Sequence, residues 1–149
     1  MDITIGCRYW TLKLPQDWVL CNEEDCVTFS GTPDLGALQM SAREKETAVD
    51  NDDLREFATQ RVDSSSRLHP VVVGSLVGYY AQSLQDETLW REWWLRSGRV
   101  MVYITYNVEE SSAGNEDDIL EDMLSTLRLR EENVETKRVE SDHSIFAYF

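Results

Sequence analysis

The chain has 149 residues, of which 42% are hydrophobic and 10% aromatic, so it can form one domain with a sizeable core and does not have the composition of a disordered protein. Its net charge of −14 repels phosphate backbones, and we therefore expect it to bind no nucleic acid. No apolar run approaches the ~20 residues of a membrane-spanning helix, and MDITIGCRYW is unlike a secretory signal, so we expect a cytoplasmic protein without membrane insertion.

The first half of the chain predicts three strands and then a helix. The strands are expected at residues 8–14, 26–30 and 36–42, separated by the turn sequences LPQDW and GTPD. The segment VDNDDLREFATQRV predicts a helix, because Leu54, Phe57 and Ala58 recur at helical spacing. Asp50 or Asn51 can cap its first turn, and the helix is expected to end before the dipeptide HP.

The second half predicts a long strand, a hairpin and a second helix. In residues 71–84 apolar side chains occur at both odd and even positions, which is typical of a central strand covered on both faces. A bulge is expected at Gly74 or Gly78. A hairpin is expected at residues 90–107. The segment DDILEDMLSTL belongs to an amphipathic helix that begins near Asn115.

These elements suggest one domain followed by a tail. Residues 1–129 are expected to form a single α+β domain, and residues 130–149 an acidic tail that ends in the apolar sequence SIFAYF. We expect this apolar end to dock on the body of the protein or on a partner.

The hairpin WREWWLRSGRVMVYITYN raises the question of whether its rings and charges serve structure or binding. If Ser97 and Gly98 form a two-residue turn, Arg96 faces Arg99 and alternate side chains sort onto two faces, with Trp93 toward the core. The opposite face combines large aromatic side chains with charges, a composition that protein-binding surfaces favour. This candidate partner-binding face consists of Trp90, Trp94, Arg96, Arg99, Met101 and Tyr103.

The same face has a structural interpretation. The second helix would cover it, with Trp90 and Trp94 in the core and the arginines against acidic helix residues such as Glu121 and Asp122. The sequence leaves both interpretations open, and one hairpin can combine them.

No catalytic or metal-binding pattern is recognisable. The two histidines, His69 and His143, lie in a predicted loop and in the tail, and nothing in the sequence brings either one next to a cysteine. The three cysteines have no CxxC spacing and suit a reducing compartment. The acidic clusters at 50–53 and 116–118 open predicted helices, where they complement the helix dipole. We therefore expect no catalytic residue, no metal and no cofactor, and the sequence favours a non-enzyme.

The order of the elements, with LPQDW near the start, GALQMSA before the first helix and DDILEDMLSTL near the end, resembles the Mog1/PsbP-like group over residues 8–129. The resemblance implies an antiparallel sheet of about six strands flanked by two helices, in the order βββ-α-βββ-α. It also implies protein binding instead of catalysis, because the group includes small bacterial proteins that serve as chaperones of secreted effectors or lie beside toxin systems.

These observations lead to three functional hypotheses. The first is a non-catalytic acidic protein-binding module, such as a bacterial chaperone or an immunity-type protein for a secreted effector or toxin. The alternative is a small-molecule-binding protein or enzyme with an aromatic-lined pocket that touches Trp93, Tyr79 or Tyr103. The third is a homodimer that forms through the hairpin edge or through SIFAYF.

Overall fold

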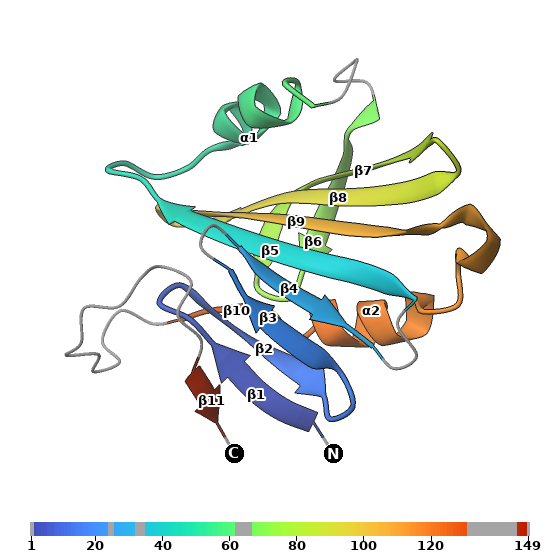
Figure 1. The fold of residues 1–149 in the computed structure, drawn as a ribbon. Coiled ribbons are helices and arrows are strands. Elements are labelled where there is room, and N and C mark those ends of the chain that lie inside the picture. The colour runs from blue at the N-terminus through green and yellow to red at the C-terminus, as the bar shows by residue number, and fades with distance from the viewer. Residues whose placement is uncertain (1, 24–25, 32–34, 62–66, 131–145, 149) are drawn as a thin grey trace.

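The alternation of polar and apolar side chains produces a fold made mainly of antiparallel strands. The computed structural model describes residues 2–23, 26–31, 35–61, 67–130 and 146–148. Its two antiparallel sheets and two α-helices confirm the predicted α+β class (Figure 1). Helix α1 (Asn51–Ala58) lies above the larger sheet, whereas α2 (Asp117–Leu124) and the smaller sheet lie below it.

The larger sheet has seven strands in the order β3-β4-β5-β9-β8-β7-β6, so β3 and β6 are its end strands. These strands are β3 (Val19–Asn22), β4 (Val27–Ser30), β5 (Gly36–Glu44), β6 (His69–Val73), β7 (Leu76–Gln85), β8 (Thr88–Ser97) and β9 (Val100–Glu109). A short 3₁₀ helix, η2 (Glu110–Ser112), follows β9. The smaller sheet has the order β10-β2-β1-β11 and contains β1 (Asp2–Gly6), β2 (Trp10–Pro15), β10 (Arg128–Leu129) and β11 (Phe146–Tyr148).

Two hydrophobic clusters lie on opposite faces of the larger sheet, because successive side chains of a strand point to opposite sides. The inner cluster packs this sheet against the smaller sheet and α2, and it includes Trp10, Leu12, Phe29, Leu95 and Leu127. The outer cluster packs α1 on the sheet, and it includes Leu54, Ala58, Tyr79, Trp94 and Met101. Full burial of a large apolar side chain contributes roughly 1.5–3 kcal/mol, so both faces stabilise the fold.

Helix α1 begins where its capping residues predict. The Oδ1 atom of Asp50 accepts a hydrogen bond from the N–H of Asp53 at 2.9 Å, and Oδ2 of Asp53 accepts one from the N–H of Asp50 at 3.0 Å. This second bond lowers the pKa of the Asp53 carboxyl, as does Lys45, whose Nζ lies 3.4 Å from Oδ1. The reciprocal pair satisfies two backbone donors that the first helical turn would otherwise leave without partners.

The buried carboxylate of Glu116 connects three parts of the chain. Its Oε1 atom accepts hydrogen bonds from the N–H of Gly36 at 3.1 Å and from the hydroxyl of Tyr106 at 2.5 Å. Glu116 precedes α2, whereas its partners begin β5 and lie in β9. The carboxylate is therefore turned toward the sheet and makes no capping bond to its own helix.

The structure corrects two predictions about the strands. The single long strand expected at 71–84 is a hairpin, because the chain reverses at Gly74 and Ser75 between β6 and β7. Gly74 has φ of +58°, a conformation that L side chains rarely adopt, and glycine provides it at low cost. The expected sheet of about six strands is also extended, since β1 and β3 were not predicted and the strands divide between two sheets.

The ends of the chain meet in the smaller sheet. Strand β11 pairs with β1, and β10 pairs with β2, so part of the apolar end SIFAYF forms a strand on the body of the protein. The acidic segment 131–145 of the predicted tail lies outside the described residues. Within the described chain, neither helix is long and apolar enough to span a membrane.

Candidate functional site

The tryptophan hairpin forms with a register that differs from the predicted one by two residues. Ser97 faces Val100, so Gly98 and Arg99 form the turn and the predicted pairing of Arg96 with Arg99 is wrong. Gly98 has φ of +58°, which fits the two-residue hairpin turn that places glycine at its first central position. A slip of two residues preserves the alternation, and the predicted division into two faces therefore holds.

The face that carries Trp94 lies under α1, so the interpretation in which the second helix covers it is wrong. Trp94 is 0% exposed and packs in one cluster with Leu54 and Ala58 of α1. Helix α2 instead meets the inner side of β8, where Nη1 of Arg91 lies 3.2 Å from Oδ1 of Asp117. The carboxylate partner of Arg91 therefore lies on α2.

The six predicted partner-binding residues lie in different environments. Trp94 and Met101 are buried, Trp90, Tyr103 and Arg96 are half-buried, and Arg99 is exposed. Arg99 donates from Nη2 to Oε2 of Glu44 at 2.9 Å, whereas Arg96 donates from Nε to the neutral Oδ1 of Asn51 at 2.8 Å. The hairpin thus places two of the six side chains in the core and leaves Arg96 without a carboxylate partner among the described residues.

A polar cluster joins the end of α1 to the sheet. The buried carboxylate of Glu92 accepts hydrogen bonds from the hydroxyl of Tyr103 and from Nε of Arg61, the latter at 3.4 Å. The Arg61 guanidinium also lies over the Tyr103 ring, 5.1 Å from its centroid. Burial raises the pKa of the Tyr103 hydroxyl, and the bond to Glu92 raises it further. Because these groups satisfy one another, the cluster stabilises the helix on the sheet.

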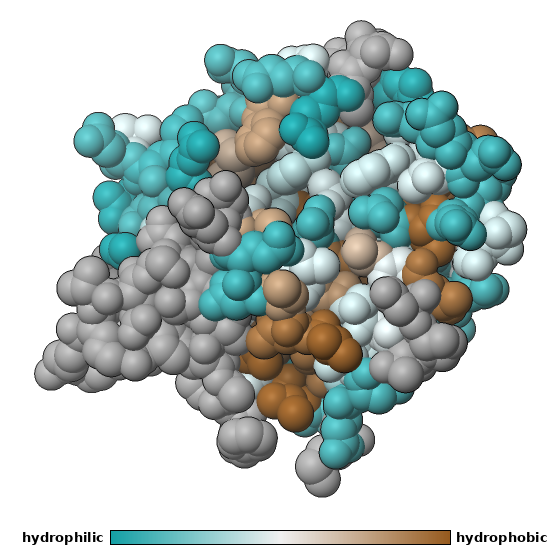
Figure 2. All heavy atoms as spheres, in the orientation of Figure 1, coloured by the Kyte–Doolittle hydropathy of each residue, from teal (hydrophilic) through white to brown (hydrophobic). Residues whose placement is uncertain are grey.

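The part of the outer face beyond α1 is polar. Gln39 donates to the Thr28 hydroxyl at 3.3 Å and accepts from the Thr105 hydroxyl at 3.4 Å, so one amide joins three neighbouring strands. Figure 2 shows this surface, over β4 and β5, as mainly pale and teal. Brown side chains gather lower, in the region where Figure 1 places β3, β2 and β1, and Val19 of β3 is 60% exposed.

A groove of about 500 Å³ lies beside end strand β6. Two valines that line it are exposed to solvent, Val72 at 75% and Val77 at 36%. The side chains around it are apolar or neutral except for one guanidinium, and they belong to Asn51, Pro70, Val71, Val72, Val77, Gly78, Tyr79 and Arg96. The sequence did not indicate this groove, because β6 and β7 were predicted as one strand and the groove forms where they pair.

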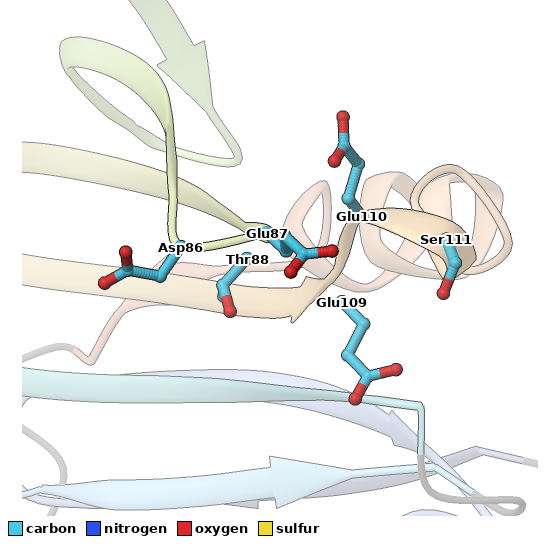
Figure 3. Close-up of a pocket in the computed structure, with 6 residues that line it drawn as sticks. All are labelled: Asp86, Glu87, Thr88, Glu109, Glu110 and Ser111. Carbon is cyan, nitrogen blue, oxygen red and sulfur yellow. The ribbon is translucent and has the colours of Figure 1, made fainter.

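A second cavity, of about 510 Å³, lies at the opposite end of the larger sheet. Four of its residues are acidic, and none of them forms an ion pair within the described chain: Asp86, Glu87, Glu109 and Glu110. Figure 3 shows that these carboxylates point in different directions and do not converge on one point. In the part of the chain that the structure describes, no group of three or more His, Cys, Asp or Glu side chains can hold a metal ion.

The candidate residues for nucleophilic chemistry are dispersed in different environments. Cys7 is buried and its Sγ accepts a hydrogen bond from the N–H of Tyr9 at 3.4 Å, whereas Cys21 is exposed on β3. His69 is exposed at the start of β6, and His143 lies outside the described residues. Nucleophilic catalysis needs a nucleophile with an oriented base, and the contacts described here assemble no such pair.

No protein-family model matches the chain, and no curated protein matches it. A crystal structure of a protein from Bacteroides thetaiotaomicron matches with a TM-score of 0.70 at 16% identity, over 89% of this chain and 50% of that one. The chain therefore spans half the length of that protein and shares its fold over this part. The solution structure of PsbP from the cyanobacterium Synechocystis matches at a TM-score of 0.44 and 8% identity, over 85% of this chain and 93% of that one. This second similarity is too low to support an argument, and the Mog1/PsbP-like resemblance stays an expectation.

Proposed function

We propose that this chain is a non-catalytic protein-binding module and that its contact surface is the groove beside β6. The observation that carries the proposal is the exposure of Val72 at 75% and Val77 at 36% in a groove that also holds the Arg96 guanidinium. Exposed apolar side chains next to an arginine are the composition that protein interfaces favour. Of the six residues predicted from the sequence, Arg96 is the one that lines this groove.

The proposed partner class follows the functional hypothesis drawn from the sequence. A chaperone of a secreted effector or an immunity protein that binds a toxin would both use a surface of this kind. The acidic cavity at the other end of the sheet supports no catalytic alternative, because its carboxylates diverge and lack a converging base or nucleophile.

The test compares two exposed valines on the two end strands of the same sheet. The tagged chain with Val72→Glu should retain less of its host partners in quantitative co-purification than the wild type, because a carboxylate would replace an apolar contact. The matched control is Val19→Glu on β3, which should retain the same partners as the wild type. If both variants and the wild type retain the same proteins in equal amounts, the groove is not the contact surface.

A second candidate function is small-molecule binding in the same groove, because Tyr79 lines it and offers a ring edge to a ligand. Screening a metabolite collection for thermal stabilisation tests it. A compound that raises the melting temperature of the wild type, and no longer does so in Val72→Glu, would favour this candidate over protein binding.

A further inference from the structure

Strand β6 is an end strand, and no other described segment pairs with its outer edge. Within the described chain it pairs with β7 on one side, from His69 opposite Tyr80 to Val73 opposite Leu76. The outer edge of such a strand presents backbone N–H and C=O groups that can pair with a further strand. The groove lies on the outer face beside this edge, because β6 lines it with Pro70, Val71 and Val72, whereas its other lining residues belong to β7, β8 and α1.

The hairpin geometry decides which backbone groups point outward. Gly74 and Ser75 form a two-residue turn, so the flanking pair Val73 and Leu76 is the hydrogen-bonded one. By alternation, the backbone groups of Val72 and Pro70 point away from β7. Proline has no N–H to offer, which explains why it is tolerated at this position. The open edge therefore offers the N–H and C=O of Val72 and the C=O of Pro70.

The charges around this edge are positive, and among the residues that the structure describes they have no carboxylate partner. Three arginines near β6 donate to neutral oxygens: Arg96 to Oδ1 of Asn51 at 2.8 Å, Arg67 to the carbonyl of Gln82 at 3.4 Å, and Arg128 to the carbonyls of Ser125 and Leu127, each at 2.9 Å. Arg128 lies next to the turn of the β6–β7 hairpin, close to Gly74. In contrast, Arg61, Arg91 and Arg99 each face a carboxylate within 4 Å.

The carboxylates nearest in sequence to the groove residue Asn51 are engaged elsewhere. Asp52 pairs with Arg55 at 3.1 Å, Asp53 pairs with Lys45 at 3.4 Å, and Asp50 caps α1. The groove therefore combines apolar side chains with one guanidinium, that of Arg96, and the guanidinium groups of Arg67 and Arg128 lie near the two ends of β6. Charge complementarity favours an acidic occupant here.

The other end strand provides the contrast. Strand β3 also exposes a valine, Val19 at 60%, but the chain carries Asp17 just before it and Glu23 just after it. An acidic segment would be repelled at β3 and attracted at β6. The difference in charge thus distinguishes two edges that are similar in hydrophobicity.

We propose that β6 accepts an extended acidic segment of a partner protein as an additional strand, with an apolar side chain on Val72 and carboxylates near Arg67 and Arg128 at the two ends of β6. This inference rests on the proposed protein-binding function and specifies its mode and the chemistry of the partner. Strand addition combines backbone hydrogen bonds, which give affinity, with side-chain contacts, which give selectivity.

The test uses short fluorescent peptides with the full chain. A peptide of alternating valine and glutamate should increase its fluorescence anisotropy with the wild type, whereas one of alternating valine and lysine should not. Blocking alternate backbone amides of the first peptide by N-methylation should abolish binding, because strand addition needs those donors. Arg67→Glu should weaken binding of the glutamate peptide about tenfold or more, because Arg67 lies at the start of β6. Val19→Glu is the matched control and should leave it unchanged.

The outcomes separate this inference from the function on which it rests. Equal binding of the glutamate and lysine peptides would overturn the acidic preference, and binding of the N-methylated peptide would overturn strand addition. No binding of either peptide, together with partner retention that Val72→Glu reduces, would overturn the strand mode and leave the protein-binding function standing. Light scattering that shows a dimer, converted to a monomer by Val72→Glu, would identify a second copy as the occupant and overturn the proposal.

Discussion

Two glycines in equivalent turns should differ in how much stability they confer. Gly74 and Gly98 each begin a two-residue hairpin turn with φ of +58°. A Cβ at Gly98 would meet no heavy atom within 4 Å, whereas a Cβ at Gly74 would lie 1.9 Å from the carbonyl oxygen of Leu127. Gly98→Ala therefore measures only the energetic cost of the backbone conformation. Gly74→Ala has the same cost and also introduces a steric clash with the carbonyl of Leu127.

The magnitudes follow from the contacts. Placing an L side chain at this φ costs about 1–2 kcal/mol, which is the expected loss for Gly98→Ala. In Gly74→Ala the backbone must also separate from Leu127, which disrupts the bond from Ser75 N–H to Leu127 at 3.0 Å and the bond from Leu129 N–H to the Ser75 hydroxyl at 3.2 Å. At about 1 kcal/mol for each bond, the total loss is about 3–4 kcal/mol.

Urea denaturation followed by tryptophan fluorescence measures both losses, and a melting curve provides an independent check. For a chain of this size the melting temperature should fall by about 3–6 °C for Gly98→Ala and by about 10 °C for Gly74→Ala. Equal losses in the two variants would refute the argument, because the close approach of Leu127 would then contribute nothing.

Two further predictions concern the turn formed by Asp86 and Glu87, and the stability of the fold at alkaline pH. Asp86 and Glu87 both have positive φ, and the second position of such a turn favours glycine. Glu87→Gly should therefore raise the free energy of unfolding by about 0.5–1 kcal/mol. Glu87→Gln removes only the charge and should leave the free energy of unfolding unchanged. Burial, and then a bond to a glutamate, raises the pKa of Tyr103 and of Tyr106 above the ordinary value of 10.0. Their stabilising contribution is therefore complete below pH 10 and declines as the pH rises above it, because the unfolded chain loses those protons first. Melting temperatures from pH 9 to 11 should fall less steeply when either tyrosine is replaced by phenylalanine, and an unchanged slope would contradict this.

The local features of the fold could be predicted where the signal was carried by neighbouring residues. The capping residues of α1 and the alternation that separates Trp93 from Trp94 both depend on short sequence spacing, and both hold in the structure. The hairpin register was missed because Ser97-Gly98 and Gly98-Arg99 are both plausible turn pairs in the sequence, and the positive φ of Gly98 at the first position distinguishes them.

The tertiary arrangement could not be predicted, because it depends on which helix reaches which face. Both helices are short and amphipathic with acidic first turns, so their sequences give no preference for covering Trp94. The β6–β7 turn was hidden within an apolar run, since β7 has buried residues on both faces, such as Tyr79 on the outer side and Leu76 on the inner side. The groove beside β6 exists only after that turn forms.

The position of Glu116 has a consequence for how the molecule opens locally. Its side chain joins the segment before α2 to the first residue of β5 and to β9, although Gly36 is 80 positions away in the chain. Fluctuations that detach α2 must also release the amide of Gly36, so the two regions should exchange their protons with deuterium at similar rates. The replacement Glu116→Gln would keep the shape and weaken this linkage, and the exchange of Gly36 should then accelerate independently of the helix.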